Sequence, residues 1–425
     1  MAITRRALLR DGALALVGTS AIPSFLARSV FAQSASAASG RRLVVIFQRG
    51  AADGLNIVIP HAEPGYYAMR PSIAVPREQV LDLDGFFGLH PAMAPLLPLW
   101  KRNSLAIVHA AGSPDATRSH FDAQDYMESG TPGVKSTPDG WLNRALQVED
   151  ATDATDVKDA KDARRRDSSP FRAIALSPSL PRTLAGAAPA LALENVGEFG
   201  RLDAMDARAG NPFAQMYDAS ANSSIRGAGE EAFEAMRMLR SAAPEKYVPA
   251  SGAVYPASPF GRSLRQIAQL MKANFGVEAA FADVGGWDHH QNEGNVQGQL
   301  ANRLRDFSQS LAAFWTDLGD EAERTVCVTL SEFGRTARQN GTGGTDHGHA
   351  NAMFVMGGPV RGGRVYGRWP GLAPEQLYQG RDLAVTTDFR QVLGEAAQKT
   401  LRVADLRRVF PGSNLRAEGF LNLLG

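Results

Sequence analysis

The chain has 425 residues and a formal net charge of +1, with 45 Lys and Arg against 44 Asp and Glu. This balance gives no electrostatic reason to expect an anionic membrane or nucleic acid as a partner, so we predict no nucleic-acid role. The length is typical of a large α/β enzyme or of two domains. A single cysteine, Cys327, excludes an internal disulfide, and its apolar neighbours favour a small buried side chain.

Residues 1–32 have the pattern of an export signal. The pair Arg5-Arg6 precedes an apolar stretch, Ala13 to Ala27, and a small-residue cleavage pattern, Val30-Phe31-Ala32. Paired arginines indicate the twin-arginine type, so we expect the twin-arginine translocation machinery as a partner and a periplasmic or extracellular location. The alternative is a membrane anchor. Pro23 interrupts the stretch, which is shorter than the roughly 20 apolar residues of a spanning helix, so we expect no stable membrane span after cleavage.

Five apolar runs lack polar alternation, which is typical of parallel strands buried on both faces. Helical spacing of apolar residues lies between them. The predicted strands are 43–47, 105–108, 279–282, 325–330 and 352–356, and the predicted helices are 91–100, 299–318 and 389–401. Strands that alternate with helices predict an α/β domain over 41–425, with a mostly parallel sheet and helices on both faces. The charged, alanine-rich segment 150–167 is predicted to be a solvated, disordered insertion.

Polar clusters follow the predicted strands, where ligands bind in open α/β sheets. Four of the eight histidines fall in two of these clusters. The clusters are Arg49–Asn56, Arg118–Asp122, Gly285–His290, and Ser331–Arg335 followed by Gly344–His349. Carboxylate oxygen and imidazole nitrogen are ligands that suit zinc, manganese or iron. Arg49, Arg118 or Arg335 could bind a phosphate or sulfate in a bidentate manner.

Each cluster also has a structural interpretation. Ser119 precedes Asp122 by three residues, an N-cap arrangement for a helix that runs to Met127. Asp53-Gly54 could be a turn, and the residues around Asp346 could be a glycine-rich surface loop. Glu332 could be a metal ligand, a base or the ion-pair partner of Arg335, and the ion pair is favoured.

Several of these stretches resemble the exported domain-of-unknown-function family fifteen-hundred-and-one. The resemblance covers nearly all of the chain after the signal and is carried by LVVIFQRGAADGLN from Leu43, RSHFDAQDYMESG from Arg118, GGWDHH from Gly285 and SEFGRTARQNGTGGTDHGHANAMFVMGG from Ser331. That family is in turn similar to the alkaline phosphatase and sulfatase superfamily. The resemblance therefore implies an alkaline-phosphatase-like fold and a divalent metal ion, for which zinc, manganese and calcium are candidates.

Site residues are implied position by position. Asp53, Asp346 and His347 look like the ligands of one ion. Asp288 and His290 resemble ligands of a second ion, with His349 as a third candidate, while the role of His289 stays open. No histidine follows His349, where the superfamily normally has one, so the number of ions also stays open.

Ser119 looks like the superfamily's nucleophile, with Thr117 and Ser113 nearby as alternatives, and Arg118 or Arg335 would neutralise the ester oxygens. The predicted function is an exported metal-dependent hydrolase of phosphate or sulfate esters, acting on a small-molecule or cell-envelope substrate. The alternative is a non-catalytic cell-envelope binding protein that reuses the fold.

Overall fold

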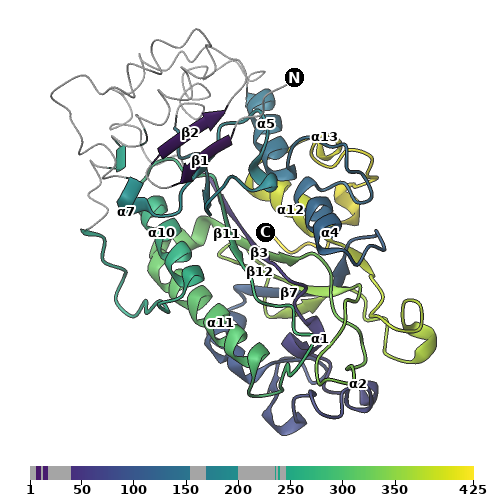
Figure 1. The fold of residues 1–425 in the computed structure, drawn as a ribbon. Helices are drawn as coiled ribbons and strands as arrows, with labels where there is room; N and C mark the ends of the chain where they lie inside the picture. The colour runs from purple at the N-terminus through teal and green to yellow at the C-terminus, as the bar shows by residue number, and fades with distance from the viewer. Residues whose placement is uncertain are drawn as a thin grey trace, which may run out of the picture.

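A nine-stranded sheet lies at the centre of the fold (Figure 1). The computed structural model describes residues 6–10, 13–17, 40–153, 169–199, 235, 238–239 and 246–425. The strand order is β13-β7-β12-β11-β3-β10-β8-β9, and β14 also pairs with β7. The strands are β3 (Arg42–Gln48), β7 (Leu105–Gly112), β8 (Ala173–Leu176), β9 (Leu191–Ala192), β10 (Ala279–Val284), β11 (Thr325–Ser331), β12 (Asn351–Gly357), β13 (Arg364–Tyr366) and β14 (Thr387–Asp388).

All five predicted strands are present, as β3, β7, β10, β11 and β12. The direction predicted for one of them is wrong, because β12 runs antiparallel to both β11 and β7. The segment from Glu332 to Ala350 contains no helix to carry the chain back across the sheet, as a parallel connection would require. The chain therefore turns at the carboxyl end of β11 and re-enters the sheet from the same edge.

Helices cover both faces of the sheet, which confirms the predicted α/β class (Figure 1). Alternate residues of β3 point to opposite faces: Val44 and Ile46 join one core, and Val45 and Phe47 join the other. The first core includes α10 (Pro259–Lys272) and α11 (Gln299–Leu318). The second includes α4 (His120–Ser129), α5 (Trp141–Asp153), α12 (Phe389–Thr400) and α13 (Leu406–Val409).

The predicted helices form at or near the expected bounds. Helix α11 begins and ends as predicted, and its apolar face is buried. The prediction over 91–100 is correct in place but not in type, since the chain forms a 3-10 turn, η3 (Pro91–Leu96), and then α3 (Leu97–Lys101). Pro95 and Pro98 lack the N–H groups that a continuous α-helix needs. Cys327 is buried within β11, as predicted.

Short elements complete the described chain. They are β1 (Arg6–Arg10), β2 (Ala13–Val17), α1 (Gly54–Ile57), β4 (Val58–Ile59), α2 (Pro64–Met69), η2 (Arg77–Gln79), β5 (Leu81–Asp82), β6 (Gly88–Leu89), η5 (Arg182–Leu184), α7 (Val196–Phe199), η7 (Gly319–Arg324), η8 (Pro374–Gln376) and η9 (Ala417–Gly419). Strands β1 and β2 pair antiparallel, and β4, β6 and β5 form a small separate sheet.

Two sequence predictions fall largely outside the described residues. Apart from β1 and β2, the predicted signal 1–32 lies outside them. The predicted insertion begins inside the last turn of α5, and its residues from 154 onwards also lie outside them. Among the helices in the described ranges, none combines the length and apolar character needed to cross a bilayer.

Candidate metal centre

Loops that follow β3, β7, β10 and β11 meet at one edge of the sheet. The Glu332 carboxylate, at the end of β11, accepts a hydrogen bond of 2.8 Å from the backbone N–H of Gly50, beyond β3. The same carboxylate contacts Nδ1 of His120, beyond β7, at 2.7 Å. The antiparallel direction of β12 keeps the whole 332–350 segment at this edge. The strand-end clusters predicted from the sequence therefore do converge.

Three imidazoles and one carboxylate lie together at this edge, and we call His120, Asp288, His290 and His347 the histidine cluster. Nε2 of His347 lies 3.0 Å from Nε2 of His120 and 3.0 Å from Nε2 of His290. Oδ1 of Asp288 is 3.0 Å from His290 and 3.3 Å from His347, and its Oδ2 is 3.5 Å from His120. Ligand atoms of His120, Asp288 and His347 all lie within 4.8 Å of one another, the one such group in the described ranges, and His290 adjoins this group without belonging to it.

The opposite nitrogen of each imidazole is held by an acceptor. Nδ1 of His120 faces Glu332 at 2.7 Å, Nδ1 of His290 faces Asp346 at 3.2 Å, and Nδ1 of His347 faces the Arg118 carbonyl oxygen at 2.9 Å. These partners favour the tautomer with the proton on Nδ1, which leaves each Nε2 lone pair free on the side where the imidazoles meet. Lone pairs that converge in this way are favourable only when a cation or proton lies between them.

The donor set fits a borderline transition-metal ion. Tetrahedral zinc with nitrogen ligands at 2.0–2.1 Å places neighbouring donor atoms about 3.3 Å apart. This is close to the 3.0 Å between His120 and His347 and to the 3.3 Å between His347 and Asp288. Imidazole nitrogens suit zinc and similar ions, whereas calcium prefers a shell made only of oxygens. The side chains of Asp288 and His290 are 44% and 41% exposed, so one side of the centre is open to solvent.

Arg335 positions the Asp288 carboxylate. Its buried guanidinium donates to Oδ1 of Asp288 at 2.5 Å and to the carbonyl oxygens of Gly50, Ala51, Trp287 and Thr345. These bonds join the loops after β3, β10 and β11. They occupy donors that the sequence prediction assigned to substrate oxygens, so the contacts of Arg335 within the described chain are structural, and its role as an anion clamp stays a prediction.

Hydrogen bonds around the centre hold its carboxylates in the charged form. Burial would raise the pKa of Asp288, but the hydrogen bond and charge of Arg335 outweigh it, and the pKa is lowered. The pKa of Glu332 is also lowered, because hydrogen bonds from His120 and Gln124 outweigh its burial. The hydrogen bond to Glu332 raises the pKa of His120, whereas burial lowers the pKa of His347. The centre therefore keeps its negative charges at neutral pH, as a cation site requires.

Asp53 is not brought to Asp346 and His347, contrary to the sequence expectation. It is 2% exposed, and both its oxygens bind the guanidinium of Arg70, at 2.5 and 3.0 Å. Arg70 also donates to the carbonyl oxygens of Thr336 and Ala337. Asp53 thus neutralises a buried arginine that supports the loop after β11.

His349 is likewise separate from the histidine cluster. Its ring stacks on Tyr378, with ring centroids 4.4 Å apart, and burial lowers the pKa of His349. His289 is buried, and burial lowers its pKa to about 4. Of the two adjacent histidines, His290 is therefore the one that joins the histidine cluster.

Ser119 caps a helix, as one of its two sequence interpretations predicted. Its hydroxyl oxygen accepts a long hydrogen bond, 3.5 Å, from the backbone N–H of Asp122 at the start of α4. Arg118 pairs with the buried Asp382, with one nitrogen–oxygen distance of 2.5 Å. Arg49 pairs with Glu128 and Asp283. The contacts of these three side chains within the described chain are structural.

Sequence reasoning missed His120 as a candidate ligand and favoured the wrong partner for Glu332. Both residues lie in strand-end clusters that the sequence singled out, but the resemblance directed attention to Ser119 instead. The signal in the sequence was His120 itself, because a histidine at the first residue of a helix that follows a buried strand lies at the edge of the sheet where ligands bind. Glu332 contacts His120 rather than Arg335.

Glycines allow the loop after β11 to fold onto its neighbours. A Cβ atom on Gly348 would lie 2.3 Å from the backbone carbonyl carbon of Arg335, and one on Gly344 would lie 2.3 Å from that of His290. Neither position tolerates a side chain without movement of backbone. Gly348 also donates to the Gly334 carbonyl oxygen at 2.8 Å, which closes the loop on itself.

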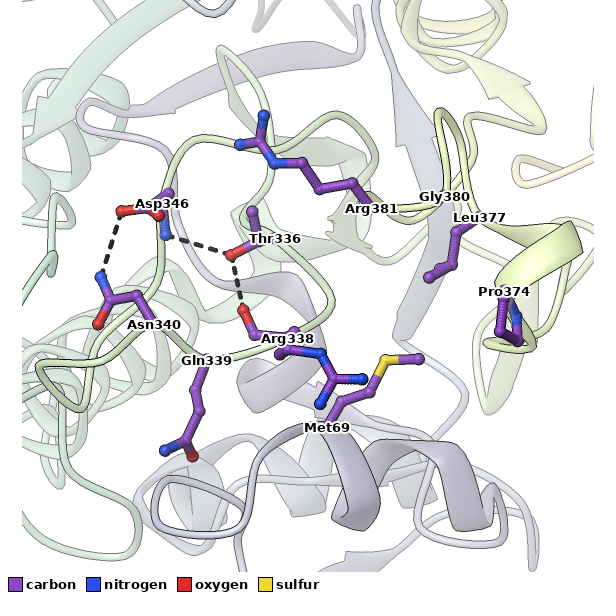
Figure 2. A pocket seen from close by; sticks show the side chains of 10 residues that line it. All are labelled: Met69, Thr336, Arg338, Gln339, Asn340, Asp346, Pro374, Leu377, Gly380 and Arg381. Carbon is purple, nitrogen blue, oxygen red and sulfur yellow. Dashed lines mark hydrogen bonds between the residues drawn. The ribbon is translucent and has the colours of Figure 1, made fainter.

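An open pocket of about 290 Å³ adjoins the histidine cluster, and we call it the arginine pocket (Figure 2). The lining includes Met69, Arg338, Asn340, Asp346, Leu377 and Arg381. Asp346 belongs both to this lining and to the hydrogen-bond partners of the histidine cluster, through Nδ1 of His290. The two features therefore share a wall.

Fold and site together define an α/β protein with a candidate divalent-metal centre at one edge of its sheet. The chain belongs to the family described as protein of unknown function (DUF1501), whose model matches residues 100–412. No curated protein matches the sequence. A solved structure, that of the PsFucS1 sulfatase from Pseudoalteromonas sp., is 12% identical with a TM-score of 0.33, covering 88% of this chain and 70% of that chain. So low a structural similarity is no basis for a function.

Proposed function

We propose that the protein is a metal-dependent hydrolase of phosphate or sulfate esters, with one divalent ion in the histidine cluster. The observation that supports this proposal is that ligand atoms of His120, Asp288 and His347 lie within 4.8 Å of one another, with His290 beside them and each histidine oriented by a partner on its other nitrogen. Structural zinc sites are closed by protein ligands, whereas catalytic sites keep a position for water or substrate. The exposed side of Asp288 and His290 offers such a position.

A divalent ion held there would act as a Lewis acid on an ester oxygen and lower the pKa of a nearby water. The residues around it bind and orient. Glu332, Asp346 and the Arg118 carbonyl oxygen hold the three imidazoles, and Arg335 holds Asp288. Hydrolysis adds water across the ester, releases the alcohol and leaves free phosphate or sulfate. In this proposal water is the attacking group and enters at the exposed side.

The test is turnover of 4-nitrophenyl sulfate and 4-nitrophenyl phosphate by zinc-equilibrated protein. We expect His120→Ala to lose turnover and zinc together, while the matched variant His61→Gln, far along the chain and paired with Asp82, keeps both. Bound zinc without hydrolysis of either ester would favour the non-catalytic binding role instead.

Ser119→Ala separates the two candidate attacking groups. If water attacks, the variant keeps turnover within a few-fold and keeps its zinc. Loss of turnover with zinc retained would assign the attack to Ser119 and overturn the assignment to water.

The proposed place of action is the periplasm or the cell exterior, and the support is the Arg5-Arg6 pair with the apolar stretch that follows. Replacing both arginines by lysine should retain the protein in the cytoplasm, as measured by cell fractionation. Unchanged export of the double variant would remove the twin-arginine assignment.

A further inference from the structure

The arginine pocket contains a guanidinium that has no hydrogen-bond or ion-pair partner among the described residues. It belongs to Arg338, whose carbonyl oxygen accepts from Thr336 but whose exposed side chain lies in the lining of a concave site (Figure 2). Arg381, the second arginine of the lining, donates to the His347 carbonyl oxygen and approaches Asp382 at 3.4 Å. The pocket therefore presents positive charge beside the histidine cluster.

The other polar side chains of the pocket already have partners. The amide of Gln339 contacts the backbone N–H and hydroxyl of Ser72. Asn340 donates to the His290 carbonyl oxygen and to Asp346, and its own oxygen accepts from Thr342 and Gly344. A polar ligand group thus finds mainly arginine donors, which select an anion over a neutral group.

The lining of the pocket has fewer carboxylates than arginines. Asp346 is the one carboxylate in the lining. Its Oδ1 is shared between Nδ1 of His290 and the Asn340 amide, both at 3.2 Å. The lining therefore has two guanidinium groups and one carboxylate that is already engaged, and of the two arginines only Arg381 has an ion pair, with Asp382 outside the lining.

Apolar side chains complete the lining. Met69, Pro374 and Leu377 line the pocket together with Arg338 (Figure 2). The volume of about 290 Å³ is near the lower end of the range for small-molecule sites, about 300–1,000 Å³, and suits one small group rather than a whole large ligand. The ligand group that complements this lining is a carboxylate attached to a flat or apolar scaffold.

We propose that the arginine pocket binds a second, non-reacting anionic group of the substrate, with Arg338 as a specificity-determining residue. This assignment to the substrate rests on the proposed function, because the shared Asp346 places the pocket beside the reacting centre. The preferred esters would then be those that carry a carboxylate away from the bond that is hydrolysed.

Binding of benzoate, measured by ligand-observed NMR titration of zinc-equilibrated full chain, tests the pocket without any turnover. Benzyl alcohol is the neutral counterpart. We expect Arg338→Gln to weaken the binding of benzoate about tenfold, or about 1.4 kcal/mol, without changing the binding of benzyl alcohol. Arg416→Gln, which changes an exposed arginine outside the pocket, should bind benzoate like the unmodified protein. Equal benzoate affinity in Arg338→Gln and the unmodified protein would overturn the proposal.

Inhibition assays separate this proposal from the proposed function. If the protein hydrolyses aryl esters, benzoate should inhibit the unmodified protein more strongly than it inhibits the Arg338→Gln variant. Inhibition equal in both would contradict the placement of the pocket beside the reacting group. Arg338-dependent benzoate binding in a protein without hydrolase activity would preserve the anion site and reject the hydrolase.

Discussion

At the scale of single residues, Arg335 shows how a buried cation can organise a metal site by holding a proposed ligand, Asp288, without contacting the ion itself. The guanidinium joins three loops through carbonyl oxygens and fixes the Asp288 carboxylate at 2.5 Å. The planar fork makes several bonds at fixed angles, and a lysine ammonium cannot reproduce them. The orientation of Asp288 should therefore depend on the shape of the arginine and not only on its charge.

Arg335→Lys should weaken zinc affinity about 10- to 100-fold, the usual cost of losing a residue that orients a ligand. Competition with a chromogenic chelator measures the affinity. Arg338→Lys, on the same loop but exposed, is the matched control and should leave zinc affinity unchanged. A circular-dichroism melt confirms that Arg335→Lys is folded, and unchanged zinc affinity in the folded variant would contradict the role of Arg335.

Strand-end geometry was enough to predict which polar clusters come together. Asp288, His290 and His347 lie in such clusters, because polar residues at the ends of parallel strands meet at one edge, and the resemblance selected them within the clusters. Asp53 lies apart from the cluster because it pairs with Arg70, in an intervening loop that strand patterns do not locate. His349 lies apart because two residues after His347 the chain has already turned back toward β12, and the His349 ring stacks on Tyr378.

At the scale of secondary-structure elements, α4 connects the site to its scaffold. His120 is its first residue and Ser119 is its N-cap. The left-handed Gly130, with φ of 68°, ends the helix. The cap therefore fixes the helix end that carries a proposed ligand.

Loss of the Ser119 hydroxyl should lower the unfolding free energy by about 0.5–2 kcal/mol, and the long cap bond of 3.5 Å favours the lower part of that range. Urea denaturation of Ser119→Ala measures it. Ser119→Asp should restore much of the stability, because aspartate is also a good N-cap. If Ser119→Asp is no more stable than Ser119→Ala, the cap contributes nothing.

The end of α11 is fixed by a buried carboxylate. Asp317 accepts hydrogen bonds from the hydroxyls of Tyr247 and Tyr255, at 2.7 and 3.0 Å, and from Lys272 at 3.0 Å. Burial alone would raise the pKa of Asp317, but these bonds and that from the Ala250 N–H outweigh it, so the pKa is lowered. Ionised Asp317 therefore stabilises the folded state above the unfolded pKa of about 4, and this contribution is lost as the pH falls through the lowered folded-state value.

Asp317→Asn should destabilise the protein by about 1–3 kcal/mol at pH 7, since buried donors lose their charged acceptor. The difference from the unmodified protein should shrink below about pH 4, as measured by denaturation over a pH series. Asp320→Asn, at an exposed position three residues on, should show neither effect. A difference that stays constant down to pH 2 would contradict the assigned ionisation.

Sequence patterns located the elements better than their directions. The bounds of α11 followed from its apolar spacing, since that spacing reports burial on one face. The direction of β12 did not follow from its apolar pattern, because a fully buried strand has the same apolar composition whether it runs parallel or antiparallel. Its direction depends on the loop between Glu332 and Ala350, and that loop depends on glycine contacts such as Gly348 against Arg335.

At the scale of the whole molecule, the histidine cluster joins segments from four parts of the chain. His120, Asp288 and His347 come from loops that follow three different strands, and Glu332 links them to the loop after β3. An ion bound there would cross-link these loops in the folded state only. Metal binding should therefore be coupled to global stability.

Removal of the metal by chelation should lower the melting temperature. A free zinc concentration 1,000 times Kd stabilises the folded state by about 4 kcal/mol, so the shift should grow with zinc concentration. Differential scanning calorimetry with and without EDTA measures it, and His347→Ala should show no zinc-dependent shift. The same shift in His347→Ala would mean that zinc binds elsewhere.

The fold class and the edge that carries the site could be read from the sequence, because alternating strands and helices leave few arrangements. Which polar residues are structural and which belong to the site could not be predicted from the sequence. Burial and partners decide it: Arg335 and Asp53 are enclosed and paired, whereas Asp288 and His290 remain partly exposed.

The zinc content of purified, zinc-equilibrated protein, measured by inductively coupled plasma mass spectrometry, tests the central claim most directly. His120→Ala and His349→Ala form the decisive pair, since only His120 belongs to the histidine cluster. We predict one zinc per chain in the unmodified protein and in His349→Ala, and none in folded His120→Ala. Zinc retained in His120→Ala and lost in His349→Ala would contradict the account.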